Sequence, residues 1–178
     1  MKLNTFYIFL IKSSLYFLLL SFSIIFCIIY LMNLEKLKKI NNFCMKCAIA
    51  SSELSVAKRK KVGAVIARES RILASGYNGQ PYHLDNCCEI TNEKTGEMTT
   101  KETVVHAEMN AILFCAKYGI SVDGADLYVT MCPCQKCAGA IIQSGIKKVF
   151  YLDEYRDMTA IETLEAAGIK IERIDLDE

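Results

Sequence analysis

Beyond residue 32, apolar positions form short continuous runs separated by stretches with helical spacing. The runs predict a buried strand at about residues 62–67 and further strands at about 71–77, 127–131, 148–152 and 170–174. Spacings of three and four predict helices at about 33–52, 105–117, 134–144 and 159–167, and Gly145 and Gly168 follow the last two as stop signals. Strands alternating with helices indicate an α/β layer fold with a mainly parallel later portion.

One polar stretch, residues 82–103, shows neither an apolar run nor the spacing of a helix, so it is expected to be a loop. Loops of this length inside a compact domain are more often functional than idle.

The first 32 residues form an apolar segment with two interpretations. Residues 13–34 carry no charge, and about 20 such residues can span a bilayer as a helix. The lysines that follow would then leave the remainder on the cytoplasmic side. In the other interpretation the segment is translated upstream sequence, and the functional protein starts at Met32. Both divide the chain into residues 1–32 and a domain at 33–178.

Charge and cysteine content narrow the classes of partner. The 178 residues carry 21 basic and 20 acidic side chains, so no strong field favours a nucleic acid, and a small-molecule ligand fits better. Nine cysteines is an odd number, and one C-x-x-C accompanies a His-x-Glu, which points to metal thiolates in a reducing, cytoplasmic compartment.

Two short motifs supply a complete set of metal donors. They are His106-Ala107-Glu108 and Pro133-Cys134-Gln135-Lys136-Cys137. His106 and the two cysteines begin predicted helices, whose N-termini gather at the carboxyl edge of an α/β sheet. Three protein ligands leave a fourth zinc position open for water, as in catalytic sites, and Glu108 is placed to move a proton. H-x-E followed by P-C-x-x-C is the signature of zinc-dependent base deaminases.

Other cysteines and cations near these motifs have plainer interpretations. Cys44 and Cys47 lie on an apolar helical stripe and are expected in the core, while Cys132 should pack or line the pocket. The run Lys58-Arg59-Lys60-Lys61 is either a solvated loop or a contact for a phosphate.

At these residues the sequence resembles the cytidine and deoxycytidylate deaminase family. The matching stretches are Lys61-Val62-Gly63-Ala64-Val65-Ile66, Gly76-Tyr77-Asn78-Gly79-Gln80-Pro81, His106-Ala107-Glu108-Met109-Asn110-Ala111-Ile112 and Pro133-Cys134-Gln135-Lys136-Cys137-Ala138. The residues of these stretches are most similar to those of the deoxycytidylate (dCMP) deaminase branch, which occurs in phages as well as cells.

The resemblance implies a three-layer α/β/α sandwich around a five-stranded mixed sheet. It also implies zinc-dependent hydrolysis of dCMP to dUMP and ammonia for thymidylate synthesis, by a homo-oligomer that is commonly hexameric and often controlled by dCTP and dTTP. His106, Cys134 and Cys137 would bind zinc, Glu108 would shuttle the proton, and Asn78 and the backbone of Ala107 would face the nucleotide. Lys61 and Tyr155 are weaker candidates for contacts to its sugar or phosphate.

A second, structural zinc occurs in some phage members, with cysteines ahead of the first strand and in the insert. In this sequence no cysteine lies just ahead of the first strand, and only the insert carries such cysteines, Cys87 and Cys88 near His83. One zinc ion is therefore expected.

Other functions remain open at this point. A tRNA adenosine deaminase or another cytidine or nucleotide deaminase shares the zinc motifs, although a tRNA enzyme should carry a more basic surface. A non-catalytic, membrane-tethered zinc module is a hypothesis of a different class.

Overall fold

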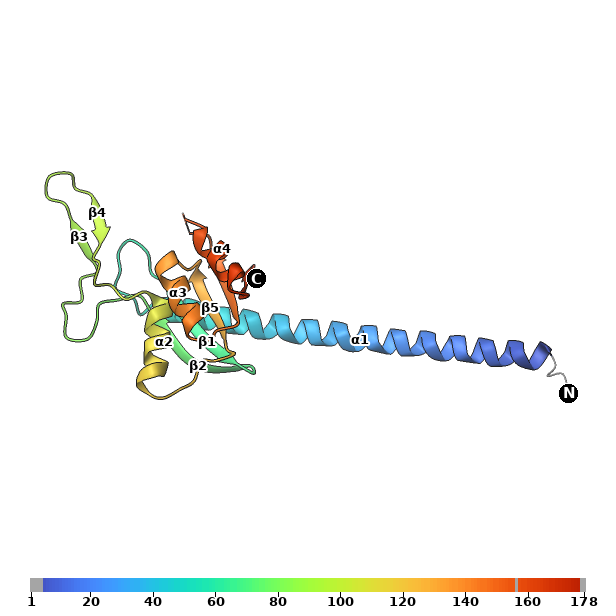
Figure 1. The fold of residues 1–178 in the computed structure, drawn as a ribbon. Coiled ribbons are helices and arrows are strands. Elements are labelled where there is room, and N and C mark those ends of the chain that lie inside the picture. The colour runs from blue at the N-terminus through green and yellow to red at the C-terminus, as the bar shows by residue number, and fades with distance from the viewer. Residues whose placement is uncertain (1–4, 156, 177–178) are drawn as a thin grey trace. The chain divides into compact units, whose positions relative to one another are not determined.

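The computed structural model describes the backbone of residues 5–155 and 157–176, and side chains from residue 25 onward within those ranges. Four helices are present in this part of the chain: α1 (Thr5–Ser52), α2 (Ala107–Lys117), α3 (Gln135–Gln143) and α4 (Thr159–Ala166) (Figure 1). The strands are β1 (Gly63–Arg68), β2 (Arg71–Tyr77), β3 (Glu89–Thr91), β4 (Met98–Thr100), β5 (Asp126–Met131), β6 (Lys148–Asp153) and β7 (Lys170–Arg173). The chain divides into two compact units, Met1–Lys39 and Ile40–Glu178.

The first unit is helical from Thr5 onward, so the prediction that the first helix begins near Asn33 is wrong. Neither glycine nor proline interrupts the sequence between Thr5 and Ser52, and nothing local stops the helix. Side chains 25–39 are exposed. Most of the predicted spanning segment, residues 1–24, lies outside the described side chains. Within what is described, no helix combines the length and apolar character needed to cross a bilayer.

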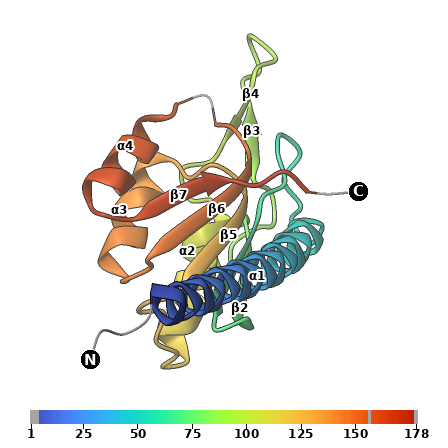
Figure 2. The ribbon, with the colours of Figure 1, turned by 90° about the vertical axis from the view of Figure 1, so that its right-hand side faces the viewer.

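The second unit is built on a five-stranded sheet in the order β2-β1-β5-β6-β7. Strand β1 pairs antiparallel with both β2 and β5, whereas β5, β6 and β7 run parallel, side by side in Figure 2. The mixed sheet and its parallel later portion are confirmed.

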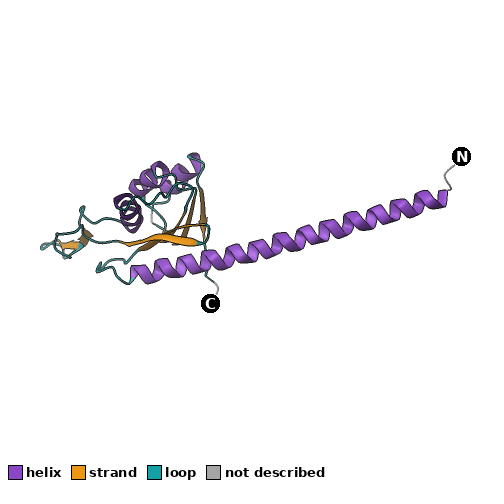
Figure 3. Cartoon of the chain, turned by 90° about the horizontal axis from the view of Figure 1, so that it is seen from below, coloured by secondary structure: helices purple, strands orange, loops and turns teal. Residues whose placement is uncertain are grey.

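Alternate residues of each central strand face opposite layers. Leu127 and Val129 of β5 join the core beneath α2, α3 and α4, whereas Tyr128 between them joins the core formed with α1 from Ile40 onward. Helices therefore cover both faces of the sheet (Figure 3), which confirms the α/β/α sandwich.

The last turns of α1 pack closely on the sheet. Cys44, Met45 and Ala48 are completely buried, as predicted for Cys44, while Cys47 is half-buried. At Gly63 of β1, an added Cβ would collide with the carbonyl oxygen of Ala48, so a hydrogen is all that fits there.

The polar stretch 82–103 is not simply a loop, because β3 and β4 pair within it as an antiparallel hairpin. Asn92 begins its turn, in which the Gly96 amide donates to the Asn92 carbonyl at 2.8 Å and Gly96 has a φ of +70°. Five of the six strand residues are exposed, so no alternation of apolar and polar residues marked these strands. The hairpin extends away from the main sheet (Figure 1).

We expect Asp126→Asn to stabilise the fold at neutral pH. Asp126 Oδ1 is buried and has no hydrogen-bond donor among the described residues, and burial raises the carboxyl pKa although Lys147 and Lys148 oppose this. A raised pKa means that the folded state loses stability as pH rises past the unfolded value. The asparagine variant should therefore raise Tm by about 2–4 °C near pH 7.5, and this gain should vanish near pH 4. Thermal unfolding at both pH values measures it, and an equal gain at both would contradict this explanation.

Candidate metal centre

The side chains of two helix N-caps turn toward each other at the edge of the sheet. His106 is the N-cap of α2, and Cys134 is the N-cap of α3, both with extended backbone angles. N-caps usually accept a hydrogen bond from their own helix, yet neither of these side chains does so. Both side chains are therefore available to bind the same metal ion.

The three predicted donors form one cluster. His106 Nδ1 lies 3.5 Å from Cys134 Sγ and 3.4 Å from Cys137 Sγ, and all three donor atoms lie within 4.8 Å of one another. Tetrahedral zinc, with bonds of about 2.0–2.3 Å, holds its ligands roughly 3.5–3.8 Å apart. Imidazole and thiolate donors at this separation fit zinc and leave one position open.

Within this cluster the two thiols are electrostatically unequal. A hydrogen bond from the Cys137 thiol, with His106 adding to it, lowers the pKa of Cys134 to about 3, whereas the same hydrogen bond and burial raise the pKa of Cys137. The hydrogen bond to Cys134 also raises the pKa of His106. One thiolate is thus already favoured, and a metal ion would take the place of the shared proton.

Glu108 lies in the first turn of α2 and is not part of the donor cluster. Its side chain is only 4% exposed, and burial raises the pKa of its carboxyl, with its own backbone amide and His106 opposing the rise. A raised pKa makes the carboxylate a stronger base, which suits it to accept a proton and pass it on.

Close packing of α2 on β2 positions both His106 and Glu108. An added Cβ at Gly76 would lie 2.5 Å from the Ala107 carbonyl oxygen and 2.6 Å from the Ala111 amide nitrogen. Asn110 Nδ2 donates to the Tyr77 carbonyl at 2.8 Å and ties the same helix to the end of β2.

The cluster opens onto a cavity of about 630 Å³. Of the residues predicted for the site, His106, Glu108, Cys134, Asn78, Ala107 and Tyr155 line this cavity. Cys137 lies behind the wall, and Lys61 is exposed and does not line it. The basic run contributes Arg59 and Lys60 in place of Lys61. Cys132 is buried and lines the cavity, as predicted.

The side chain of Asn78 is already engaged by the basic run. Its Oδ1 accepts from the Val62 amide at 2.8 Å, and its Nδ2 donates to the Lys60 carbonyl at 3.0 Å. Asn78 therefore shapes the cavity wall through the backbone of residues 60–62.

The hairpin supplies a second wall that the sequence pattern did not indicate. Its contributions are Glu89, Glu97, Thr99 and Thr100, with Glu102 just beyond. These four carboxylate and hydroxyl side chains, closely spaced in sequence, could have indicated a binding wall. Without periodicity, however, nothing in the sequence distinguished them from an exposed polar loop.

Cys87 is exposed, whereas Cys88 is buried against Ala57 and Val104. Across the described residues, His106, Cys134 and Cys137 are the group of three side chains close enough to hold a metal ion.

An α/β/α sandwich with a three-ligand His/Cys/Cys centre defines a class of zinc-binding proteins, and comparison with known proteins identifies the family within it. Residues 38–153 match the model of the cytidine and deoxycytidylate deaminase zinc-binding region. The chain belongs to this family, and zinc is its cofactor.

Individual relatives point in the same direction. The chain is 41% identical over 129 residues to ComE operon protein 2 of Bacillus subtilis, covering 70% of this chain and 65% of the relative. It is 35% identical over 143 residues to deoxycytidylate deaminase of Saccharomyces cerevisiae, covering 78% of this chain and 46% of the relative. The dCMP deaminase of cyanophage S-TIM5, solved with dCMP and dUMP, is similar at a TM-score of 0.68 and 42% identity, covering 73% of this chain and 93% of that one. The chain thus spans between about half and two thirds of the two curated relatives.

We expect Gly76→Ala to destabilise the fold and weaken zinc binding together, because the new methyl group pushes the start of α2 off β2. Overpacking of this kind costs about 1–3 kcal/mol. The matched control is Gly139→Ala in α3, where an added Cβ meets no atom within 4 Å and alanine favours the helix by up to about 1 kcal/mol. Urea unfolding and zinc titration measure both, and unchanged zinc affinity in Gly76→Ala would contradict the positioning role of this contact.

We also expect Cys134→Ser and Cys137→Ser to lower zinc affinity by more than about a hundredfold, since each removes a donor. Glu108→Gln should keep about one zinc ion per chain, because the carboxyl is outside the donor cluster. Elemental analysis of the purified variants checks this, and loss of zinc from Glu108→Gln would make Glu108 a ligand.

Proposed function

We propose that residues 33–178 form a deaminase domain that hydrolyses dCMP to dUMP and ammonia and so supplies dUMP for thymidylate synthesis. The observation that carries the proposal is one cavity that joins the metal donors and buried Glu108 to the cations Arg59 and Lys60. The 42% identical cyanophage enzyme was solved with dCMP and dUMP, which supports the same substrate here.

Zinc held by His106, Cys134 and Cys137 would supply a water molecule of lowered pKa, a good nucleophile at neutral pH. Glu108 accepts the proton of this water and passes it to the ring nitrogen beside the amino-bearing carbon of cytosine. The hydroxide that remains adds to that carbon, Glu108 moves the proton of the new hydroxyl group to the amino group, and ammonia leaves as the carbonyl forms. Because Glu108 is 4% exposed, its protons move within the cavity and not to bulk solvent.

The cations that line the cavity suit the nucleotide's phosphate. Arg59 and Lys60 are exposed residues of this lining, and a guanidinium group can bind phosphate with two parallel hydrogen bonds. We assign the phosphate to these two cations instead of Lys61. Asn78, Ala107 and Tyr155 also line the cavity, and we assign the sugar and pyrimidine to them.

We infer a homo-oligomer, with a hexamer as the expected form. Leu113, Phe114 and Tyr118 on the outer side of α2 are 45–59% exposed, and apolar side chains gathered on one helix favour burial against another chain. Control by dCTP and dTTP stays a prediction. All nine cysteines are free, which supports a reducing compartment such as the cytoplasm.

The test is ammonia release from dCMP, dCTP, cytidine, deoxycytidine and a tRNA anticodon stem-loop, measured side by side. We expect dCMP to be turned over most efficiently, and Glu108→Gln to lower kcat by about 100- to 10,000-fold while zinc is retained. Turnover of another substrate but not dCMP would overturn the substrate assignment. Undiminished activity in Glu108→Gln would overturn the catalytic role of Glu108, and no turnover of any substrate by the zinc-loaded protein would favour a non-catalytic zinc module.

A further inference from the structure

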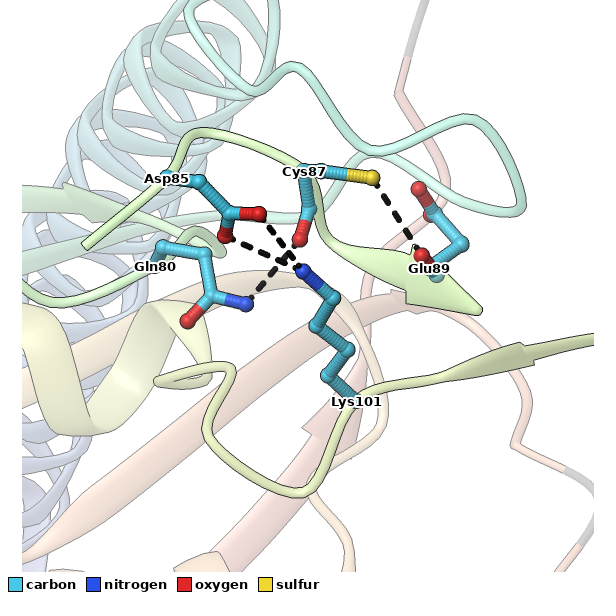
Figure 4. A network of polar contacts seen from close by, with 5 residues as sticks. All are labelled: Gln80, Asp85, Cys87, Glu89 and Lys101. Atoms are coloured by element: carbon cyan, nitrogen blue, oxygen red, sulfur yellow. Dashed lines mark hydrogen bonds and ion pairs between the residues drawn. The ribbon is translucent and has the colours of Figure 1, made fainter. Parts of the chain in front are cut away.

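Glu89, the first residue of β3, has an unusual environment for a carboxylate. It is 8% exposed, and its Oε1 accepts hydrogen bonds from the amides of Lys58 and Arg59 at 2.8 and 3.2 Å. The nearby Lys101 ammonium group binds Asp85 at 3.0 and 3.1 Å and not Glu89. The backbone carbonyl oxygen of Glu89 accepts a hydrogen bond from the Cys87 thiol (Figure 4). A buried carboxylate is costly unless hydrogen-bonded, so these two amides are what stabilise it here.

The strand neighbour of Glu89 holds the side chain of the same arginine. Glu89 pairs with Thr100 across the hairpin, and Arg59 Nη1 donates to Thr100 Oγ1 at 2.9 Å. One cross-strand pair therefore binds both the backbone and the guanidinium group of Arg59.

The rest of the basic run is held from other directions. Asn78 binds the peptide groups of Lys60 and Val62, and Lys60 Nζ forms an ion pair with Asp153 at 2.8 Å. Lys60 and Asp153 are each about half-exposed, so their ion pair is weak, whereas the Glu89 contacts are shielded from water.

We propose that Glu89 is a positioning residue that couples the hairpin to the basic run and presents Arg59 and Lys60 to the phosphate of the nucleotide. Glu89 acts through the backbone of residues 58–59 and does not touch the reacting atoms. The proposal rests on the proposed function for its substrate, and it assigns the hairpin a part in distinguishing nucleotides from nucleosides.

The test compares Glu89→Ala and Glu89→Gln with Glu93→Gln, an exposed carboxylate on the same hairpin that does not line the cavity. We expect Glu89→Ala to raise KM for dCMP and Kd for dUMP about tenfold, with kcat within about twofold of the unmodified enzyme. Activity on deoxycytidine, which has no phosphate, and zinc content should not change. Glu89→Gln keeps an acceptor oxygen, so its KM for dCMP and Kd for dUMP should lie between those of Glu89→Ala and the unmodified enzyme. Glu93→Gln should match the unmodified enzyme.

Thr100→Val provides a second variant if Glu89→Ala fails to fold, and a smaller rise of KM for dCMP is expected from it. An equal loss on dCMP and deoxycytidine would show a merely structural role and overturn the proposal. A lower KM for dCMP, or tighter dUMP binding, would also overturn it, because the carboxylate would then be occupying the position of the phosphate. Absence of dCMP turnover by the unmodified enzyme would instead refute the proposed function, and dUMP titration of the variants would still decide the role of Glu89.

Discussion

The site depends on bringing the N-termini of α2 and α3 close enough for their N-cap side chains to bind one metal ion. Neither His106 nor Cys134 has a side-chain N-cap hydrogen bond, and their donor atoms lie 3.5 Å apart. That separation is set by α2 packing on β2 at Gly76 and by α3 following directly from β5. A shift of α2 alone would pull one imidazole away from two thiols, so the metal centre is only as well ordered as the contact between that helix and the sheet.

The cavity has two walls of different physical character. One is the edge of the sheet with the helix N-termini, where Ala107 and Cys132 are buried. The other is the basic run and the β3–β4 hairpin, which is mostly exposed and is held by a few polar contacts, chiefly those of Glu89 and Asn78. Chemistry that needs fixed geometry belongs to the first wall. Recognition of the substrate's variable parts is better suited to the second, where residues can change without disturbing the core.

Elements with a strong hydrophobic pattern were predicted well. The strands at 127–131 and 148–152 are mostly apolar because both faces of the sheet are covered there, and Gly145 and Gly168, with φ of +82° and +79°, come just after the helices that follow these two strands. The two errors have different origins. The start of α1 was placed near Asn33 because the uncharged segment before it was treated as a separate part of the chain, whereas the helix continues through it. The hairpin was missed because its exposed strands lack the alternation of apolar and polar residues that marks a half-buried strand.

The sequence by itself determined the metal donors and the fold class. His106, Cys134 and Cys137 have a spacing and an order that chemistry restricts tightly, and the core is specified by local patterns of burial. Only the tertiary structure decided which cations reach the cavity and what holds them. Arg59 and Lys60 line it while Lys61 does not, and the outcome depends on hydrogen bonds that backbone groups of residues 58–62 form with Glu89 and Asn78, which lie some 16 to 31 residues away along the chain. Four consecutive basic residues look alike in sequence, and contacts between distant segments are what distinguish them.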